Sequence, residues 1–231
     1  MSDGSLKRFG LRCLGAFEGV EIWQARLDLS GHELGSVSGL LSPFETLQAA
    51  RYGSALLRSR FVARRGLLRL LLAGHLGERP ESVAIREERG SKPALASGSW
   101  HFNVSSSSDV AMFALSTSHE IGIDVEGVDP QFPTEAVARD HFAPSERAAL
   151  ESAGPGSRPL VFFTFWTRKE ACAKALGLGI CDSFACYETQ MPLGSLYTPM
   201  PVFHSGSLDS RLTVFDVDAG DGFAAAVAIR F

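Results

Sequence analysis

The chain has few cysteines and no long hydrophobic run, and each absence excludes a class of protein. No apolar stretch in its 231 residues approaches the roughly 20 residues of a membrane span. The first ten residues contain two basic side chains but no apolar stretch after them, so they do not resemble a secretory signal. The four cysteines are too scattered for a disulfide framework or a zinc site: Cys13, Cys172, Cys181 and Cys186. We therefore expect reduced thiols in a cytoplasmic protein without a membrane partner.

The chain also lacks an excess of positive charge. Its formal net charge of -4 argues against generic binding to nucleic acid. Residues 1–115 nevertheless contain 14 Lys and Arg against 11 Asp and Glu, whereas residues 116–231 contain 8 against 15. A basic half joined to an acidic half suits a ligand that carries phosphates at one end and a metal at the other. A chance variation of surface charge explains the same distribution equally well.

Helices and strands are both predicted, with no internal repeat and no low-complexity linker. Alternating apolar residues predict strands over 20–29, 99–104, 109–116, 121–126, 212–217 and 223–231. Helices are predicted to begin at Ser42 and Ala143 and to cover residues 59–76 and 158–176, with Gly177 ending the last one. The serine run 105–108 is predicted to be a solvated loop or a cradle for a phosphate. The length suits one large domain or two small lobes.

The predicted helix over residues 59–76 carries many arginines beside an apolar side. Its basic side chains are Arg58, Arg60, Arg64, Arg65 and Arg69. A solvated face and a surface for phosphates or an acidic partner are equally consistent with this pattern, since the guanidinium group supplies forked donors.

Asp124 and Glu126 stand two apart in a predicted strand, so both carboxylates point to the same face. Like charges at this spacing repel each other unless they are solvated or bridged by a cation. Solvent exposure is the commoner arrangement. A buried pair bridged by Mg²⁺ is the alternative, because this cation prefers a few carboxylates together with phosphate oxygens and waters.

Trp166, Glu170 and Lys174 are spaced four apart in the predicted helix over 158–176, so they share one helix face. The simplest interpretation is an exposed pair of Glu170 and Lys174 beside a core tryptophan, worth a few tenths of a kcal/mol. The acidic strand upstream favours a functional interpretation, in which the two elements meet.

Four segments together resemble the 4′-phosphopantetheinyl transferases of the surfactin-synthetase-activating type. The segments are Gly90-Ser91-Lys92-Pro93-Ala94-Leu95, His101-Phe102-Asn103-Val104-Ser105, Gly122-Ile123-Asp124-Val125-Glu126 and Phe165-Trp166-Thr167-Arg168-Lys169-Glu170-Ala171-Cys172-Ala173-Lys174-Ala175-Leu176-Gly177. They follow the family's order and spacing, and the resemblance covers roughly residues 40–231.

The resemblance implies an α+β fold built as a pseudo-twofold pair of similar lobes, each a small, mainly antiparallel sheet packed with helices. The expected lobes are residues 1–115, with nucleotide and phosphate contacts, and residues 116–231, with the metal site and the catalytic helix. Coenzyme A is expected in the cleft between them. The implied monomeric enzyme transfers 4′-phosphopantetheine from coenzyme A to a serine of an apo acyl or peptidyl carrier protein and releases adenosine 3′,5′-bisphosphate.

The resemblance also implies roles for individual residues. The residues expected to hold Mg²⁺ are Asp124, Glu126 and Glu170. The expected catalytic residues are Glu170, Lys174 and Asp124, with Glu170 or a metal-bound water taking the serine proton and the lysines stabilising the leaving phosphate. The residues expected to bind the nucleotide and its phosphates are Arg60, Lys92, Ser105, Ser106, Lys169 and Lys174.

The chain departs from the family pattern at Ser106, where the family usually has a histidine that contacts a phosphate of coenzyme A. A hydroxyl donates a hydrogen bond but carries no charge, so we expect this contact to be weaker. Compensation by Arg58, Arg64 or Arg65 is open. Also open are a non-catalytic relative that binds a carrier protein or nucleotide, and another Mg²⁺-dependent phosphoryl enzyme. The arginine-rich helix is the candidate docking surface for an acidic carrier protein.

Overall fold

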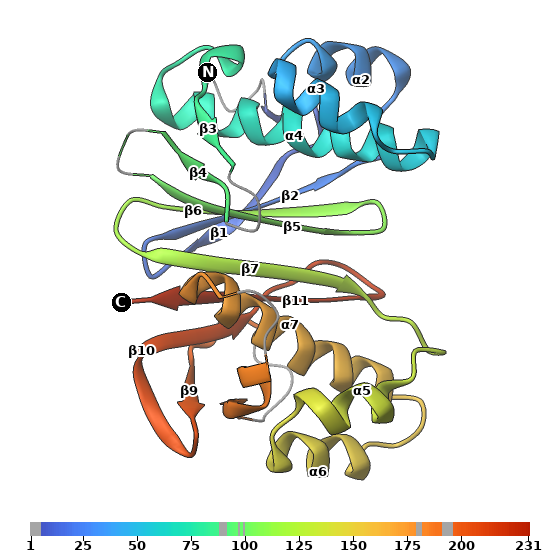
Figure 1. Cartoon of the computed structure of the whole chain (residues 1–231), viewed down its shortest axis with the longest axis vertical. Helices are drawn as coiled ribbons and strands as arrows, with labels where there is room; N and C mark the ends of the chain where they lie inside the picture. The colour runs from blue at the N-terminus through green and yellow to red at the C-terminus, as the bar shows by residue number, and fades with distance from the viewer. Residues whose placement is uncertain (1–5, 88–91, 97, 99, 179–181, 191–195) are drawn as a thin grey trace.

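Helices and antiparallel sheets alternate along the chain in the computed structural model, which describes residues 6–87, 92–96, 98, 100–178, 182–190 and 196–231 (Figure 1). The expected mixture of helices and antiparallel sheets is thereby confirmed. The pseudo-twofold relation between lobes stays a prediction. No helix in the described ranges combines the length and the hydrophobicity that crossing a membrane requires.

The N-terminal sheet is antiparallel and has the strand order β1-β2-β6-β5. Its strands are β1 (Arg12–Phe17), β2 (Val20–Arg26), β5 (His101–Ser107) and β6 (Val110–Ser116). The helices above it in Figure 1 are α2 (Gly31–Ser38), α3 (Pro43–Ala50) and α4 (Ala55–Leu76). The shorter elements of this half are the 3-10 helix η1 (Pro80–Ser82) and the ribbon of β3 (Ile85–Arg86) and β4 (Ala94–Leu95). One hydrophobic core joins α4 to the sheet through Leu67, Leu71 and Phe113.

The C-terminal sheet is also antiparallel, with the order β7-β11-β10-β9-β8. Its strands are β7 (Glu120–Gly127), β8 (Tyr187–Thr189), β9 (Met200–His204), β10 (Ser207–Asp216) and β11 (Phe223–Arg230). Its helices are α5 (Thr134–His141), α6 (Pro144–Ser152), α7 (Arg158–Leu176) and the 3-10 helix η2 (Asp182–Cys186). α7 lies against β7 and β11 and ends at Gly177, whose φ of 73° is easily adopted by glycine.

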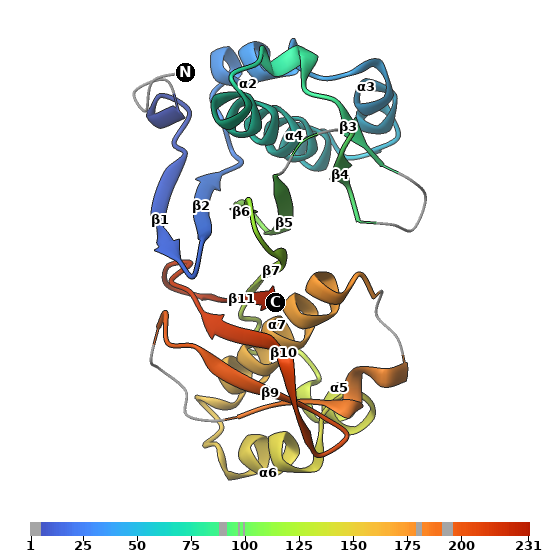
Figure 2. The same ribbon diagram turned by 90° about the vertical axis from the view of Figure 1, so that its left-hand side faces the viewer.

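Edge strands of the two sheets, β5 and β7, lie side by side in the middle of the molecule (Figures 1 and 2). A shared apolar core also joins the sheets. It includes Val20, Ile22, Met112 and Ala114 from the first sheet and Ile121, Ile123, Val125 and Val227 from the second. The chain passes from one sheet to the other between Ser116 and Glu120, and the shared core shows that the two sheets are packed together. The division into residues 1–115 and 116–231 stays a prediction.

The serine run was predicted to form a loop, and this was wrong for most of it. Ser105, Ser106 and Ser107 belong to β5, and only Ser108 lies in the turn, with φ of 53°. The strand extends through the serines because their backbones pair with β6, from Ser105 opposite Met112 to Ser107 opposite Val110. Alternating serine side chains consequently point to opposite faces of β5.

Candidate active site

A row of side-chain hydrogen bonds joins the two edge strands. Asn103 Oδ1 accepts from the backbone N of Ile123 at 2.8 Å, and Ser107 Oγ donates to Glu126 Oε2 at 2.8 Å. Between them Ser105 Oγ donates to Asp124 Oδ1 at 2.7 Å. These β5 residues are two apart and share one face, so the contacts follow β7 in the same direction. The N-terminal sheet thereby orients the two carboxylates of the C-terminal sheet.

Asp124 is buried at the meeting point of β5, β7 and α7. Lys174 Nζ lies 2.6 Å from Asp124 Oδ1 and also donates to Ser105 Oγ and to the carbonyl oxygen of Ile123, both at 3.2 Å. The other carboxylate oxygen, Asp124 Oδ2, is buried and has no hydrogen-bond partner among the described residues. A buried carboxylate oxygen without a partner is unfavourable unless a cation or another donor satisfies it.

Gly122 allows α7 to approach β7 closely enough for this contact. A Cβ atom at position 122 would collide with the carbonyl of Ala171 and lie 2.6 Å from the backbone N of Ala175. Only a glycine fits there without movement of the helix. The close approach places Lys174 beside Asp124, although they are 50 residues apart in the chain.

Glu126 and Glu170 lie close enough to Asp124 for their charges to interact. Burial, followed by the charge of Asp124, raises the pKa of Glu126 above its ordinary value. Burial also raises the pKa of Glu170; the charge of Lys174 opposes the shift, and those of Asp124 and Glu126 add to it. The three expected carboxylates are therefore brought into one electrostatic neighbourhood, two from β7 and one from α7.

The donor chemistry of this neighbourhood fits a hard divalent cation. Carboxylate oxygens are the ligands that Mg²⁺ prefers, and Asp124 Oδ2 is a buried oxygen that a cation would satisfy. Within the described residues, no three His, Cys, Asp or Glu side chains already stand in a metal-holding arrangement. The ammonium of Lys174 instead neutralises part of the charge at Asp124.

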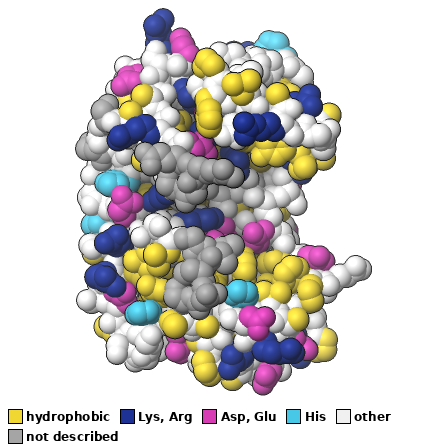
Figure 3. Space-filling model, in the orientation of Figure 1, with side chains coloured by type: hydrophobic (Ala, Val, Ile, Leu, Met, Phe, Trp, Pro, Cys, Tyr) yellow, Lys and Arg dark blue, Asp and Glu magenta, His cyan; other side chains and the backbone are white. Residues whose placement is uncertain are grey.

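A cavity of about 530 Å³ lies at the C-terminal end of α7 and is lined by both halves of the chain, with Ala175, the residue after Lys174, in its wall. Lys92, Trp100 and His101 contribute from one side, and Glu120 and the end of α7 from the other. In Figure 3 the waist between the two halves is hollowed, and basic and acidic side chains lie in it. A ligand here would contact both sheets.

Lys92 is held at the wall of this cavity. Its Nζ donates to Glu120 Oε2 at 3.0 Å and to the carbonyl oxygen of Ile121 at 2.6 Å. Burial lowers the pKa of Lys92 from its ordinary value, while Glu120 opposes the shift. The preceding residues of the predicted turn, 88–91, lie outside the described residues.

Ser106 points to the opposite side of β5 from Ser105, because neighbouring residues of a strand alternate. Its Oγ accepts from Arg64 Nη1 of α4 at 3.0 Å. Ser105 and Ser106 were predicted to share a role at the phosphates, but the structure separates them. Ser105 contacts Asp124, and Ser106 contacts an arginine of the N-terminal half.

Lys169 is not brought to this site. It lies on another face of α7, and its side chain is 0% exposed and forms an ion pair with Glu146 Oε2 at 2.8 Å. Its ammonium also donates to the carbonyl oxygens of Phe184 and Tyr187. The expected role at the phosphates does not fit this position, since successive helix residues are turned by about 100° and only one of Lys169 and Glu170 can face β7.

Arg60 is likewise separate from the cavity residues. Its guanidinium makes two hydrogen bonds to the carboxylate of Asp28, at 2.7 and 2.8 Å. Arg65 and Arg69 are also not free for a partner, because both are buried and bind Glu45, at 2.8 and 2.6 Å. Of the predicted basic residues of this helix, Arg65 and Arg69 are therefore internal, whereas Arg58 is exposed.

Asn103 and Gly122 contribute to the site, but the sequence alone assigned them no role. The spacing of Asn103, Ser105 and Ser107 in one strand is a signal that could have indicated a common polar face. Nothing local marks Gly122, because the requirement for a glycine comes from a helix about 50 residues further on.

Much of this chain is similar in sequence to known proteins. The family model of the 4′-phosphopantetheinyl transferase superfamily matches residues 120–228, which include Asp124, Glu126, Glu170 and Lys174. The 4′-phosphopantetheinyl transferase HetI of Nostoc sp. is 36% identical over 165 residues, which cover 70% of this chain and 70% of the relative.

Two shorter matches point to the same superfamily. The 4′-phosphopantetheinyl transferase AcpT of Salmonella typhimurium is 37% identical over 111 residues, covering 47% of this chain and 56% of the relative. A 4′-phosphopantetheinyl transferase of Bacillus subtilis is 31% identical over 123 residues, covering 52% of this chain and 54% of the relative.

Proposed function

Because this chain belongs to the 4′-phosphopantetheinyl transferase superfamily, we propose that it transfers 4′-phosphopantetheine from coenzyme A to a serine of an apo carrier protein. The observation that carries the proposal is the meeting of Asp124 and Lys174 at 2.6 Å, with Glu126 and Glu170 beside them. Ala175, the residue after Lys174, lines a cavity to which both halves of the chain contribute.

In the proposed reaction the hydroxyl oxygen of the carrier serine attacks the β-phosphorus of coenzyme A. A new serine O–P bond forms, the P–O bond within the pyrophosphate breaks, and adenosine 3′,5′-bisphosphate leaves. Glu170 accepts the serine proton, a role that suits a carboxylate whose pKa burial raises. Lys174 stabilises the negative charge that develops on the leaving phosphate, and Lys92 binds a phosphate of the nucleotide.

We assign the residues that would hold Mg²⁺ as Asp124, Glu126 and Glu170. A bound divalent cation would neutralise the pyrophosphate and polarise its oxygens. The buried, unpartnered Oδ2 of Asp124 supports the assignment. Ser105 and Ser107 support it from β5, because their hydroxyls orient the carboxylates of Asp124 and Glu126.

The finer features implied by the resemblance stay part of the proposal. They are a pseudo-twofold pair of lobes, residues 1–115 and 116–231, and a monomeric cytoplasmic enzyme of the surfactin-synthetase-activating type. The relatives HetI, AcpT and the Bacillus subtilis enzyme carry names that assign them to no such type. The type therefore stays a prediction.

The proposed function is tested by incubating the protein with coenzyme A, Mg²⁺ and a panel of apo carrier proteins from fatty-acid, polyketide and peptide synthesis. The carriers are then weighed by mass spectrometry. We expect at least one carrier to gain the mass of one phosphopantetheine group. Binding of a carrier without any gain in mass would favour the alternative, a non-catalytic relative.

A further inference from the structure

Arg64 differs from Arg60, Arg65 and Arg69 of α4 in what it contacts. Arg60, Arg65 and Arg69 each bind a carboxylate at 2.8 Å or less. Among the described residues, Arg64 has no carboxylate within ion-pair distance, and its one hydrogen bond goes to Ser106 Oγ at 3.0 Å. A guanidinium has five N–H donors, so most donors of Arg64 have no acceptor in the described chain.

Arg64 is nevertheless half-buried, so its charge is partly removed from water. Burial lowers the pKa of Arg64 from its ordinary value, and the guanidinium lies 5.8 Å from the centre of the Phe61 ring. The charge of Glu87 opposes this pKa shift, although no ion pair with Arg64 forms. Burying a charge without a counter-ion in contact with it is costly. We therefore expect an anionic ligand to supply the missing counter-ion of this guanidinium group.

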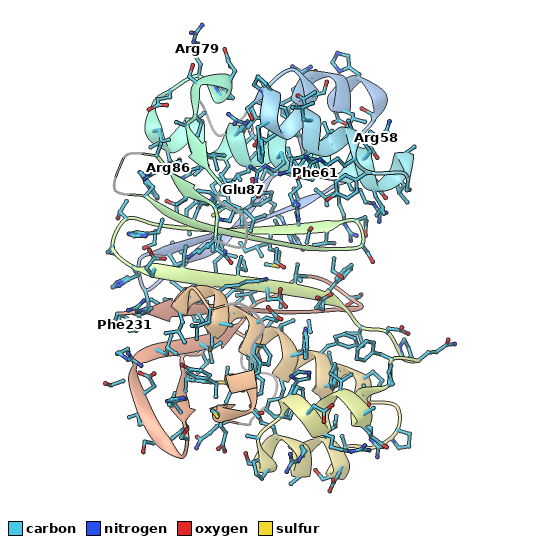
Figure 4. All side chains as sticks on the ribbon, viewed as in Figure 1. Arg58, Phe61, Arg79, Arg86, Glu87 and Phe231 are labelled. Atoms are coloured by element: carbon cyan, nitrogen blue, oxygen red, sulfur yellow. The ribbon has the colours of Figure 1, made fainter. Side chains whose placement is uncertain are left out.

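A second cavity, of about 150 Å³, supplies the place for that anion. Arg64, Phe102 and Asn103 line it, and it shares Pro93 and Phe102 with the larger cavity that contains Lys92. Glu87 also lines it, but Arg65 Nη2 lies 2.9 Å from the Glu87 carboxylate and balances its charge. Phe61 and Glu87 are labelled in Figure 4, where both lie between α4 and the strands below it.

We propose that Arg64, oriented by the hydroxyl of Ser106, is an anion subsite that binds a phosphate group of coenzyme A. The guanidinium fork matches two phosphate oxygens. The cofactor then extends from this subsite along Pro93 and Phe102 into the cavity with Lys92. The inference rests on the proposed function for the identity of the ligand.

The test measures the affinity of the full-length chain for coenzyme A and for 3′-dephospho-coenzyme A by isothermal titration calorimetry. Arg64→Gln removes the charge, and Arg79→Gln is the matched control. Arg79 has a side chain that is 81% exposed and points away from the cavity in Figure 4. We expect Arg64→Gln to weaken binding of coenzyme A by about 10- to 100-fold, and Arg79→Gln to leave it within about twofold.

The two ligands identify the phosphate. If the subsite takes the 3′-phosphate, Arg64→Gln loses the preference of the wild type for coenzyme A over the dephosphorylated form. If it takes the pyrophosphate, Arg64→Gln weakens both ligands equally. Affinities of Arg64→Gln that match those of Arg79→Gln would overturn the subsite.

Two further results separate the possible failures. A wild-type protein that binds neither ligand would overturn the proposed function itself. Thermal unfolding shows whether Arg64→Gln folds. If it does not fold, Arg64→Lys is tested instead, because it keeps the positive charge and loses the paired N–H donors of the guanidinium group. We then expect about a 10-fold weaker affinity for coenzyme A with a retained salt dependence. An unchanged affinity would overturn the subsite.

Discussion

The long helices α4 and α7 both bury several of their charged residues in ion pairs. Both bury cations against carboxylates within their own half of the molecule: Arg65 and Arg69 with Glu45 in α4, and Lys169 with Glu146 in α7. Arg168 of α7 also makes a bidentate pair with Asp216, at 2.8 and 2.6 Å.

The helices differ in the charges that remain. α7 presents Lys174 and Glu170 to carboxylates of β7, where they form the candidate active site. α4 leaves Arg64 without a carboxylate at a cavity wall. The comparison indicates that a charged residue on either helix points to function when its side chain reaches β5, as Lys174 does at Ser105 and Arg64 does at Ser106.

The largest effect on the transfer rate is expected from changes to the carboxylates that α7 and β7 bring together. Glu170→Gln and Asp124→Asn should each lower the transfer rate by at least about 100-fold, since each removes a carboxylate while keeping its shape. Transfer is measured by mass spectrometry of the carrier, and folding by circular dichroism. Near-normal turnover in a folded variant would remove that carboxylate from the site.

The next prediction concerns the free energy of unfolding and tests whether Lys169 has a structural role. Lys169→Met leaves Glu146 buried without its partner and should lower the free energy of unfolding by about 3–5 kcal/mol. The double variant Lys169→Met/Glu146→Gln should recover most of this loss in denaturant unfolding. Its transfer rate, measured while it is folded, should stay close to that of the wild type. A large loss of transfer activity in the folded double variant would indicate that Lys169 has a role in the active site after all.

A smaller effect is expected from the crowding of carboxylates at β7. The pKa of Glu126 is raised in the folded protein, so its charge destabilises the fold above that pKa, and this penalty disappears below the ordinary value of 4.5. Glu126→Gln should therefore raise the free energy of unfolding at pH 7 in the presence of a chelator. The gain should shrink as the pH falls towards 4.5. A gain that is independent of pH would contradict this origin.

The smallest effect is expected at Arg60, whose partner Asp28 has a side chain that is 48% exposed. Arg60→Gln should change the free energy of unfolding by about 1 kcal/mol or less. Its affinity for coenzyme A should stay within about twofold of the wild type, in contrast to Arg64→Gln. A loss of tenfold or more would place Arg60 at the nucleotide.

Local patterns predicted the main elements because each pattern requires only neighbouring residues. Ser42 and Pro43 marked the start of α3, where Ser42 Oγ accepts from the backbone N of Glu45 at 3.2 Å. The alternation around Asp124 predicted β7 and the common face of its carboxylates. The helices α2 and α5 and the strand β1 were not predicted, because their short segments lack a strong period.

Roles within one helix could not be predicted from spacing alone. Glu170 and Lys174 were correctly predicted to share a face, but Lys169 received a function that its burial does not support. Arg64 and Arg65 are also adjacent, and their difference depends on which one meets Glu45. The spacing of residues along a helix determines which of them share a face, whereas the neighbouring elements determine which face is buried.

The sequence by itself determined the mixed fold class, the paired carboxylates of β7 and the one-face spacing of Glu170 and Lys174, because these depend on residues close together in the chain. Only the tertiary structure decided that β5 orients those carboxylates, that Gly122 admits α7, and that Arg64 stays without a carboxylate. These outcomes depend on contacts across tens of residues. Long-range packing, which no local period encodes, brings those groups within a few ångströms of one another.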